Sequence, residues 1–404
     1  DKALAIYDTV GAECDALATR ATQTQRLQTA GDVVASLIPQ PRACAPTNGP
    51  TDKERESAFG SDLKAMTEPQ VMSRLINWAL TDLMLAHPEI VMAGEDIGRK
   101  GGVYGATQKL QTRFGPHRVI DTLLDEQSIL GLAIGMAHNG FVPIPEIQFL
   151  AYLHNAEDQL RGEASTLPFF SNGQYANPMV LRIAGLGYQR GFGGHFHNDN
   201  SLAVLRDIPG LVIACPSRGD DAARMLREAV RLAREDQRVV VFIEPIALYP
   251  MRDLYEEGDK GWMCSYPPPD ERIALGEVGV SGDGTDLAIV TYGNGRYLSV
   301  QAAARLEGHG IRARVVDMRW LAPLPEKALV EHASACGATL IVDECRRTGS
   351  QSEALMTLFS EAGIPKFARI TAEDCFIATG PAYAATLPSA DRIVAAATDL
   401  LAKS

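Results

Sequence analysis

Short apolar runs alternate with helix-length segments through most of the chain. Val71, Leu75, Trp78 and Leu83 lie at helical spacing and predict an amphipathic helix, and the apolar runs begin soon after it. Strands separated by helix-length segments predict βαβ crossovers and a mostly parallel sheet that is covered on both faces. The predicted strands of this sheet are residues 90–93, 119–120, 142–144, 180–183, 211–214 and 239–243.

A second region repeats the pattern after a break at residues 245–269 that is rich in turn-forming residues. The fold class is therefore α/β, with two doubly wound, mostly parallel sheet domains, which we place at residues 66–250 and 270–404. The predicted strands of the second domain are 287–292, 313–316, 340–342 and 368–370, and its predicted helices are 296–307, 326–335 and 350–362.

Residues 1–65 differ in character from the rest of the chain. Apolar positions at helical spacing predict one or two helices within residues 2–37. Residues 39–50 then contain four prolines, a composition that neither a helix nor a central strand tolerates. We interpret this region as a helical segment followed by a linker.

Composition and charge exclude several classes of protein. With 38 Lys and Arg residues against 50 Asp and Glu residues, the formal net charge of −12 argues against binding to nucleic acids or anionic membranes. The longest stretch without a charged residue, residues 127–145, is interrupted by polar residues and prolines, so no transmembrane helix is predicted. The 7 cysteines are scattered without a CxxC pair, which fits reduced thiols in the cytoplasm and predicts no zinc site.

Carboxylate side chains follow three consecutive predicted strands. Glu95 follows the first strand, Asp121 the second and Glu146 the third. Ligand sites of open α/β sheets lie at the carboxyl ends of strands. These residues are therefore candidates for function, and the competing interpretation is a solvated rim.

Glu126 stands at the start of an apolar segment rich in small residues, which we expect to form a buried helix over residues 128–137. A carboxyl at such a position can exchange a proton with a ligand nitrogen. The competing interpretation is a carboxylate that is stabilised by the dipole of the helix that it begins.

Residues 185–200 form a glycine-rich segment that carries His195 and His197. Glycines permit a close approach of the backbone to a ligand, and histidines titrate near neutral pH. Three interpretations stay open: a mobile loop with solvated histidines, an acid–base or substrate-contacting site, and a metal site. The metal site has only Asp199 as an obvious third ligand.

Other polar segments of the second domain are less informative. Residues 282–284 and 293–295 are interpreted as turns, because neither has the further residues that a phosphate-binding motif requires. Asp343-Glu344 with Arg346-Arg347 forms a charged strand end, which fits either a solvated rim or a contact with another chain.

The order of these motifs resembles the β component of the thiamine-diphosphate-dependent 2-oxoacid dehydrogenases, the pyruvate and branched-chain 2-oxoacid family. The resemblance runs from Met66 to about Leu401 and implies a pyrimidine-binding domain followed by a transketolase-type C-terminal domain. It is carried by Gly94-Glu95-Asp96, Gly101-Gly102-Val103-Tyr104, residues 118–122, Glu126 with its helix, Glu146-Ile147-Gln148-Phe149, Ile208-Pro209-Gly210-Leu211, Phe242-Ile243-Glu244-Pro245 and residues 315–324 before Asp343-Glu344.

The resemblance also implies roles for individual residues. The glutamate that matches Glu126 bonds the N1′ nitrogen of the aminopyrimidine, where a proton shuttle favours the tautomer that activates the thiazolium. The position that matches Tyr152 stacks on the pyrimidine ring, and Gln148 belongs with the cofactor-binding residues. Glu95 matches a glutamate of an acidic passage between active sites. His197 matches a histidine that contacts substrate-derived intermediates and assists acyl transfer to lipoyl groups.

The chain departs from the family at two places. Where the family commonly reads His-Ser-Gln-Ser, residues 197–200 read His-Asn-Asp-Asn and His195 is added, so the choice between His195 and His197 stays open. The helix ending at residues 231–236 is longer than usual in the family, so the presence of a monovalent-cation site near it stays an open question.

From the resemblance we expect the β-type part of an E1 component in the cytoplasm. Its reaction is the oxidative decarboxylation of a 2-oxoacid, with 3-methyl-2-oxobutanoate slightly favoured over pyruvate, and reductive acylation of a lipoylated E2 acyltransferase. Residues 4–17 resemble the last helix of the α component, so we expect the C-terminal part of a fused α-β enzyme in a dimer or an α2β2-like assembly. The α-type part would hold Mg²⁺ and the diphosphate. The alternatives are ketol transfer, as in transketolase or deoxyxylulose-phosphate synthase, and a non-catalytic assembly module.

Overall fold

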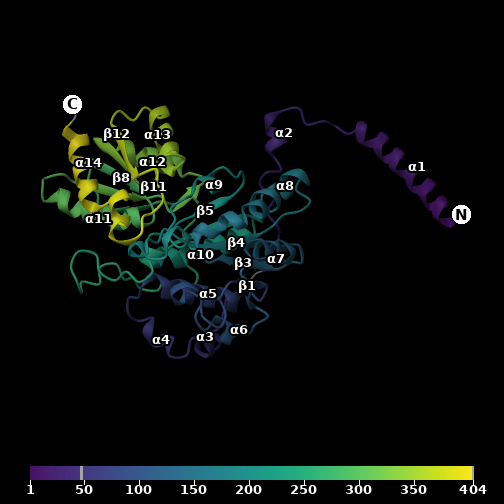
Figure 1. Cartoon of the computed structure of the whole chain (residues 1–404), viewed down its shortest axis with the longest axis horizontal. Helices are drawn as coiled ribbons and strands as arrows, with labels where there is room; N and C mark the ends of the chain where they lie inside the picture. Colours follow the sequence, from purple (N-terminus) through teal and green to yellow (C-terminus); the bar gives the residue numbers. More distant parts are fainter. Residues whose placement is uncertain (46–48, 403–404) are drawn as a thin grey trace.

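The computed structural model describes residues 1–45 and 49–402 and shows two sheets side by side, each with helices packed against it (Figure 1). The predicted linker includes residues 46–48 and the predicted second domain includes residues 403–404, and these lie outside the described residues. The parallel α/β class is confirmed. Within the described residues, β7 and β10 are the strands that the sequence pattern did not predict.

The first sheet has 7 strands, and all neighbours run parallel except β10, which is antiparallel to β5. Their order is β10 (Trp320–Ala322), β5 (Val212–Ala214), β6 (Val239–Pro245), β4 (Met179–Gly185), β3 (Val142–Ile147), β1 (Ile90–Gly94) and β2 (Val119–Asp121).

The second sheet has 5 strands, of which β7 is antiparallel to β9. Their order is β12 (Phe367–Ala372), β11 (Ala338–Arg346), β8 (Leu287–Thr291), β9 (Ala313–Asp317) and β7 (Gly279–Ser281).

Helices connect the strands of both sheets. The first domain contains α5 (Met72–Ala86), α6 (Leu110–Phe114), α7 (Glu126–His138), α8 (Thr166–Phe170), α9 (Ala203–Arg206) and α10 (Gly219–Arg234). The second contains α11 (Asn294–Glu307), α12 (Glu326–Ser334), α13 (Gln351–Glu361) and α14 (Ala390–Ala402). The N-terminal region contains α1 (Lys2–Thr22), α2 (Ala30–Val34), α3 (Asp52–Phe59) and α4 (Asp62–Ala65).

Alternate residues of the first sheet pack into two different cores, as the period of a strand requires. Val180 and Phe242 belong to a core with α5 and α10. Leu181 and Ile243 belong to a second core, which includes α7 and continues into the second domain through residues such as Val316. The two domains therefore bury apolar side chains against each other.

Strand β10 belongs by sequence to the second domain but pairs with β5 of the first. Trp320 pairs with Ala214, and the backbone N–H of Cys215 donates to the carbonyl of Arg319 at 2.8 Å. Arg319 has a φ of 59° at the point where the chain leaves β9 and enters β10. The second domain thus supplies an edge strand of the first sheet.

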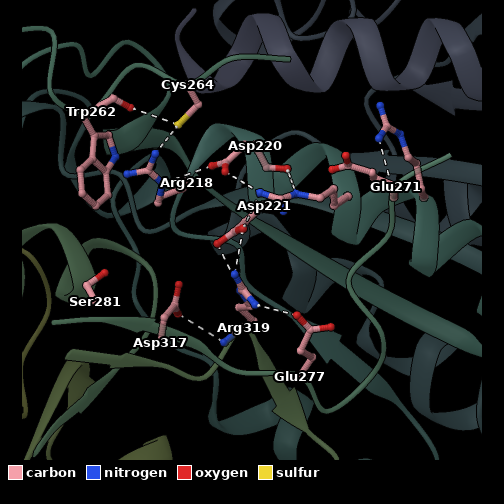
Figure 2. Close-up of polar contacts among 12 residues, drawn as sticks. Arg218, Asp220, Asp221, Trp262, Cys264, Glu271, Glu277, Ser281, Asp317 and Arg319 are labelled. Carbon is pink, nitrogen blue, oxygen red and sulfur yellow. Dashed lines mark hydrogen bonds and ion pairs between the residues drawn. The ribbon is translucent and has the colours of Figure 1, made fainter. Parts of the chain in front are cut away.

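Buried ion pairs surround this joint (Figure 2). Asp221, in the first turn of α10, is 2% exposed and accepts from Arg319 Nε at 3.1 Å and Nη2 at 3.0 Å. Arg296 Nη1 donates to both Asp221 and Asp317, at 3.0 Å each. One carboxylate of the first domain therefore binds two arginines of the second.

The N-terminal region packs only in part against the body. Helix α1 extends away from it and has no buried residue (Figure 1). The predicted linker lies against the end of α10, where the backbone N–H of Arg42 donates to the carbonyl of Glu235 at 2.8 Å. Phe59 of α3 is 3% exposed and packs with Leu75 and Trp78. Residues just before 66 thus contribute to the packed body.

Candidate active site

The three strand-end carboxylates have different surroundings. Asp121 accepts from the backbone N–H of Gly98 at 2.6 Å and of Arg99 at 3.2 Å, so it fixes the loop after β1. Glu146 is buried in an ion-pair cluster. Glu95 is half-buried, and no described residue forms a hydrogen bond or ion pair with its carboxylate. Of the three, Glu95 is the one left available to a ligand.

Glu126 and Glu95 interact electrostatically. Partial burial raises the pKa of Glu95, and the carboxylates of Asp96 and Glu126 raise it further. Glu126 is the first residue of α7 and is 4% exposed. Asn155 Nδ2 donates to Glu126 Oε2 at 3.1 Å, whereas no described residue bonds Oε1. One oxygen of this buried carboxylate is therefore available to a ligand nitrogen.

Three rings gather near these carboxylates. The ring of Phe149 is 5.8 Å from that of Tyr152 and 4.6 Å from that of His197, and the Tyr152 and His197 rings are 6.3 Å apart. Burial raises the pKa of Tyr152, and the carboxylates of Glu95 and Glu126 raise it further. The structure thus brings together four predicted site residues and adds Phe149, which the site prediction had not included.

The two histidines of the glycine-rich segment point to different places. His197 lies in the aromatic group, and its Nδ1 is 3.0 Å from the carbonyl of Gly193. The ring of His195 lies 4.0 Å from that of Phe196 and 6.3 Å from that of Phe376 in the second domain. His197 is therefore the histidine that the fold places beside Tyr152.

Gln148 follows β3 and leads into the short helix η2 (Leu150–Asn155), which carries Tyr152. Its side chain is half-buried and forms no hydrogen bond with any described residue. Its amide therefore keeps both hydrogen-bond donors and its acceptor available for a ligand.

One face of α7 is exposed, so the expectation that this helix is buried is wrong for that face. Leu130 and Ala133 are fully buried against the sheet. Leu132 is 40% exposed, and a Cβ atom at Gly131 or Gly135 would meet no atom within 4 Å. No described element covers these residues.

A buried ion-pair cluster in β3, β4 and β6 was not predicted. Arg182 donates to Glu244 from Nε at 2.7 Å and from Nη2 at 2.8 Å, and Nη1 donates to Glu146. Burial lowers the pKa of Arg182, but Glu244 and Glu146 raise it by more, so the guanidinium stays charged. The signal in the sequence was a charged residue inside the apolar run 180–183.

The charged strand end at β11 is not a solvated rim. Asp343 and Glu344 are 1% and 2% exposed. Tyr188 of the first domain donates to Glu344 Oε2 at 2.6 Å. Asn294 of the second domain donates to Oε1 from its backbone N–H at 2.8 Å and to Oε2 from Nδ2 at 2.6 Å. Burial raises the pKa of Glu344 to about 7, although these hydrogen bonds lower it. The rim interpretation failed because the partners come from distant segments.

The raised pKa of Glu344 predicts a pH-dependent stability. The folded state holds this proton more tightly than the unfolded state, so the stabilising contribution of Glu344 is fully present below about pH 4.5 and is lost as pH rises through about 7. The contribution lost is at most about 3 kcal/mol. In urea unfolding between pH 5 and 8, stability should decrease less steeply with pH in Glu344→Gln than in the wild type. Glu361→Gln, at the exposed end of α13, is the control; a wild-type slope in Glu344→Gln would contradict the assignment.

Within residues 1–45 and 49–402, no group of three or more His, Cys, Asp or Glu side chains is arranged to hold a metal ion. None of the helices described there combines the length and apolar character that crossing a bilayer requires.

Comparison with known proteins gives consistent matches. The transketolase pyrimidine-binding domain family matches residues 68–251, and the transketolase C-terminal domain family matches residues 276–393. The chain is 36% identical to the 2-oxoisovalerate dehydrogenase subunit beta of Bacillus subtilis, over 71% of this chain and 83% of that protein. It is 34% identical to the pyruvate dehydrogenase E1 component subunit beta of the same organism, over 68% and 80%. It is 31% identical to the Staphylococcus aureus protein of that name, over 82% of this chain and 98% of that protein.

Solved structures share the fold. A split-gene transketolase described as an inactive beta4 tetramer superposes with a TM-score of 0.65 at 22% identity, over 82% of this chain and 99% of that one. A Pichia stipitis transketolase superposes with a TM-score of 0.59 at 16% identity, over 83% of this chain and 47% of that one.

Proposed function

Because the chain belongs to the family of β subunits of thiamine-diphosphate-dependent 2-oxoacid dehydrogenase E1 components, we propose that it forms the β-type part of an active site for oxidative decarboxylation of a 2-oxoacid. One observation carries the proposal. The carboxylate of Glu126 is buried, has one oxygen to which no described residue bonds, and interacts with Tyr152 and Glu95. This is the arrangement that proton exchange with a bound ring nitrogen requires.

The residues around Glu126 fit the aminopyrimidine of thiamine diphosphate. Glu126 would bond a ring nitrogen through its available oxygen, and Tyr152 would contribute a flat apolar face. Gln148 offers donors and an acceptor that no described residue uses. When bound, thiamine diphosphate supplies the electron sink that decarboxylation of a 2-oxoacid needs. An α-type part would hold the diphosphate and Mg²⁺.

His197 and Glu95 would move protons beside this group. A hydrogen bond from His197 Nδ1–H to the carbonyl of Gly193 leaves Nε2 as an acceptor that can bind the substrate or take a proton from it. The pKa of Glu95 is raised, so this carboxyl can hold a proton at a higher pH than an exposed glutamate and exchange it with Glu126.

We propose that 3-methyl-2-oxobutanoate is favoured over pyruvate, and that the acyl group passes to a lipoylated E2 acyltransferase. The support is the identity of 36% with the 2-oxoisovalerate dehydrogenase subunit, against 34% with the pyruvate dehydrogenase subunit.

We also propose that an α-type part completes the enzyme, with residues 1–65 as its helical tail and linker in a fused chain. Two observations support a further partner. Helix α1 has no buried residue although Ile6, Tyr7 and Leu17 are apolar. The apolar face of α7 around Leu132, next to the candidate site, is also uncovered within the described chain. A second copy in a dimer or α2β2-like assembly is an equally suitable cover for α7.

The chain should decarboxylate 2-oxoacids only together with the α-type part, because in this proposal that part holds the diphosphate and Mg²⁺. The measurement is reduction of an artificial electron acceptor with thiamine diphosphate, Mg²⁺, and either 3-methyl-2-oxobutanoate or pyruvate. The chain alone is compared with the chain joined to its α-type part.

The proposal would be supported if only the assembled enzyme were active and its kcat/KM were higher for 3-methyl-2-oxobutanoate than for pyruvate. Activity of the chain by itself would contradict the divided site. Ketol transfer between sugar phosphates, measured in parallel, would favour a transketolase-like reaction, and a protein that binds the partner complex without turnover would be an assembly module.

A further inference from the structure

The loop of residues 186–201 carries His197 on a strained backbone. Leu186, Gln189 and Arg190 have φ values of 51°, 38° and 53°, in the left-handed region that non-glycine residues rarely adopt. Each such residue costs about 1–3 kcal/mol and persists only where surrounding contacts determine it. The position of His197 therefore depends on what anchors this loop.

The two ends of the loop are anchored by the second domain, although the loop belongs to the first. At one end, Asn294 Nδ2 donates to the carbonyl of Leu186 at 2.7 Å. At the other, Arg346 Nη2 donates to Asp199 Oδ1 at 3.2 Å, and Nη1 donates to Ser201 Oγ. Ser201 in turn donates to Asp199 Oδ1 at 2.9 Å. These three side chains form a closed group of polar contacts across the domain boundary.

Further residues of the loop also contact the second domain. Asn200 Nδ2 donates to the carbonyl of Glu344 at 2.8 Å, and Tyr188 donates to the carboxylate of the same residue at 2.6 Å. Gly191 lies so close to Gly380 that a Cβ atom on it would be 2.3 Å from the backbone nitrogen of Gly380. Contacts thus hold the loop against the second domain at several points along its length.

Arg346 binds Asp199 near His197, and further contacts hold the Arg346 side chain in place. Its Nε donates to the carbonyl of Cys375 at 3.1 Å, and its guanidinium lies 5.6 Å from the centre of the Phe376 ring. All three nitrogens of the guanidinium are therefore engaged, and the group has one defined position. Its partner Asp199 is two residues from His197, so the ion pair fixes the end of the loop at which the histidine lies.

We propose that Arg346 is a positioning residue for the reaction, which holds His197 beside Tyr152 by binding Asp199. The proposal rests on the function proposed above for His197. It also gives a role to Asp199, at which this chain departs from the His-Ser-Gln-Ser pattern of the family. The second domain thereby contributes to the active site without touching the substrate.

The test is a double-mutant cycle with Arg346→Gln and Asp199→Asn in the assembled enzyme. Misplacing a catalytic group by about 1 Å can reduce the rate about 100-fold. We expect each single variant to lower kcat at least about 10-fold, and the double variant to be no worse than Arg346→Gln alone, because both single variants remove the same ion pair. Arg346→Lys should recover part of the loss. Thiamine diphosphate affinity should stay unchanged, because Glu126 and Tyr152 do not contact this ion pair.

Hydrogen exchange of residues 186–201 supplies a readout that does not depend on turnover. Exchange should be faster in both single variants than in the wild type, and unchanged in Arg347→Gln. Arg347 is the matched control, since it is the next residue, is exposed, and its side chain forms no hydrogen bond with the loop.

Unchanged exchange in Arg346→Gln and Asp199→Asn, or additive losses of kcat in the double variant, would overturn the proposal. An equal loss in Arg347→Gln would overturn it too. If the wild type decarboxylates no 2-oxoacid, the proposed function fails, and the exchange comparison still decides whether Arg346 positions the loop. Asp199→Asn guards against misfolding, because it changes only the loop side of the contact.

Discussion

Replacing Glu126 with glutamine should lower kcat for 2-oxoacid decarboxylation by at least about 100-fold, because a carboxamide keeps the shape of the side chain but cannot exchange its proton. Asn155 can still donate to the amide oxygen, so the helix start and the folded structure should be retained. The measurement is steady-state turnover by the assembled enzyme at saturating thiamine diphosphate and Mg²⁺, which separates a loss of chemistry from weaker cofactor binding.

The control is Glu307→Gln, which makes the same chemical change at the exposed end of α11 on the second domain, whereas α7 lies on the first (Figure 1). It should leave kcat unchanged. Thermal unfolding of both variants should match the wild type. Turnover close to that of the wild type in Glu126→Gln would contradict the role assigned to this carboxylate, and with it the observation on which the proposed function rests.

Replacing Asp221 with alanine should destabilise the protein by about 3–5 kcal/mol, because it removes one partner of a buried ion pair and leaves the other charge uncompensated. Asp221 is 2% exposed and binds Arg319 through both of its carboxylate oxygens as well as Arg296. In this variant Arg296 still pairs with Asp317. Arg319 keeps a hydrogen bond to the carbonyl of Val278 and a longer ion pair with the exposed Glu277. The measurement is the free energy of unfolding in urea at neutral pH.

Asp220→Ala is a matched control at the preceding position of the same helix turn. The side chain of Asp220 is 23% exposed, and its ion pairs with Arg218 and Arg224 are more accessible to water. It should lose about 1 kcal/mol or less. Equal losses in the two variants would show that the position in the helix, rather than the buried pairing across the domain joint, determines the effect.

Long apolar runs made most strands predictable. Strands β4 and β6 have 7 residues each, enough for their composition to be distinguished from that of the flanking segments. Strands β7 and β10 are short, and no helix-length segment separates β7 from β8 or β9 from β10, so neither fits the alternation of strands and helices that identified the equally short β2 and β5. The pairing of β10 also depends on the free edge of β5, far earlier in the chain, and no local pattern records such a partner.

The candidate site was predictable to the same extent. Glu126 was visible because a carboxylate begins an apolar helix after a strand, and the resemblance supplied Tyr152 and His197. The environment of Glu344 was not visible, because its burial depends on Tyr188 and Asn294, which come from other elements. The local sequence around a strand-end carboxylate is the same whether water or a second domain covers it, so only the tertiary structure shows whether the carboxylate is buried.

Because β10 of the second domain completes the sheet of the first, the chain cannot be divided between its two domains without loss of a strand. A polypeptide that ended between β6 and β7 would contain the whole sequence of the first domain and yet lack the strand that covers β5. Its unpaired backbone N–H and C=O groups would then be a template for association with another copy. We therefore expect that a fragment which folds by itself, or which recombination transfers intact, includes both sheets and β10.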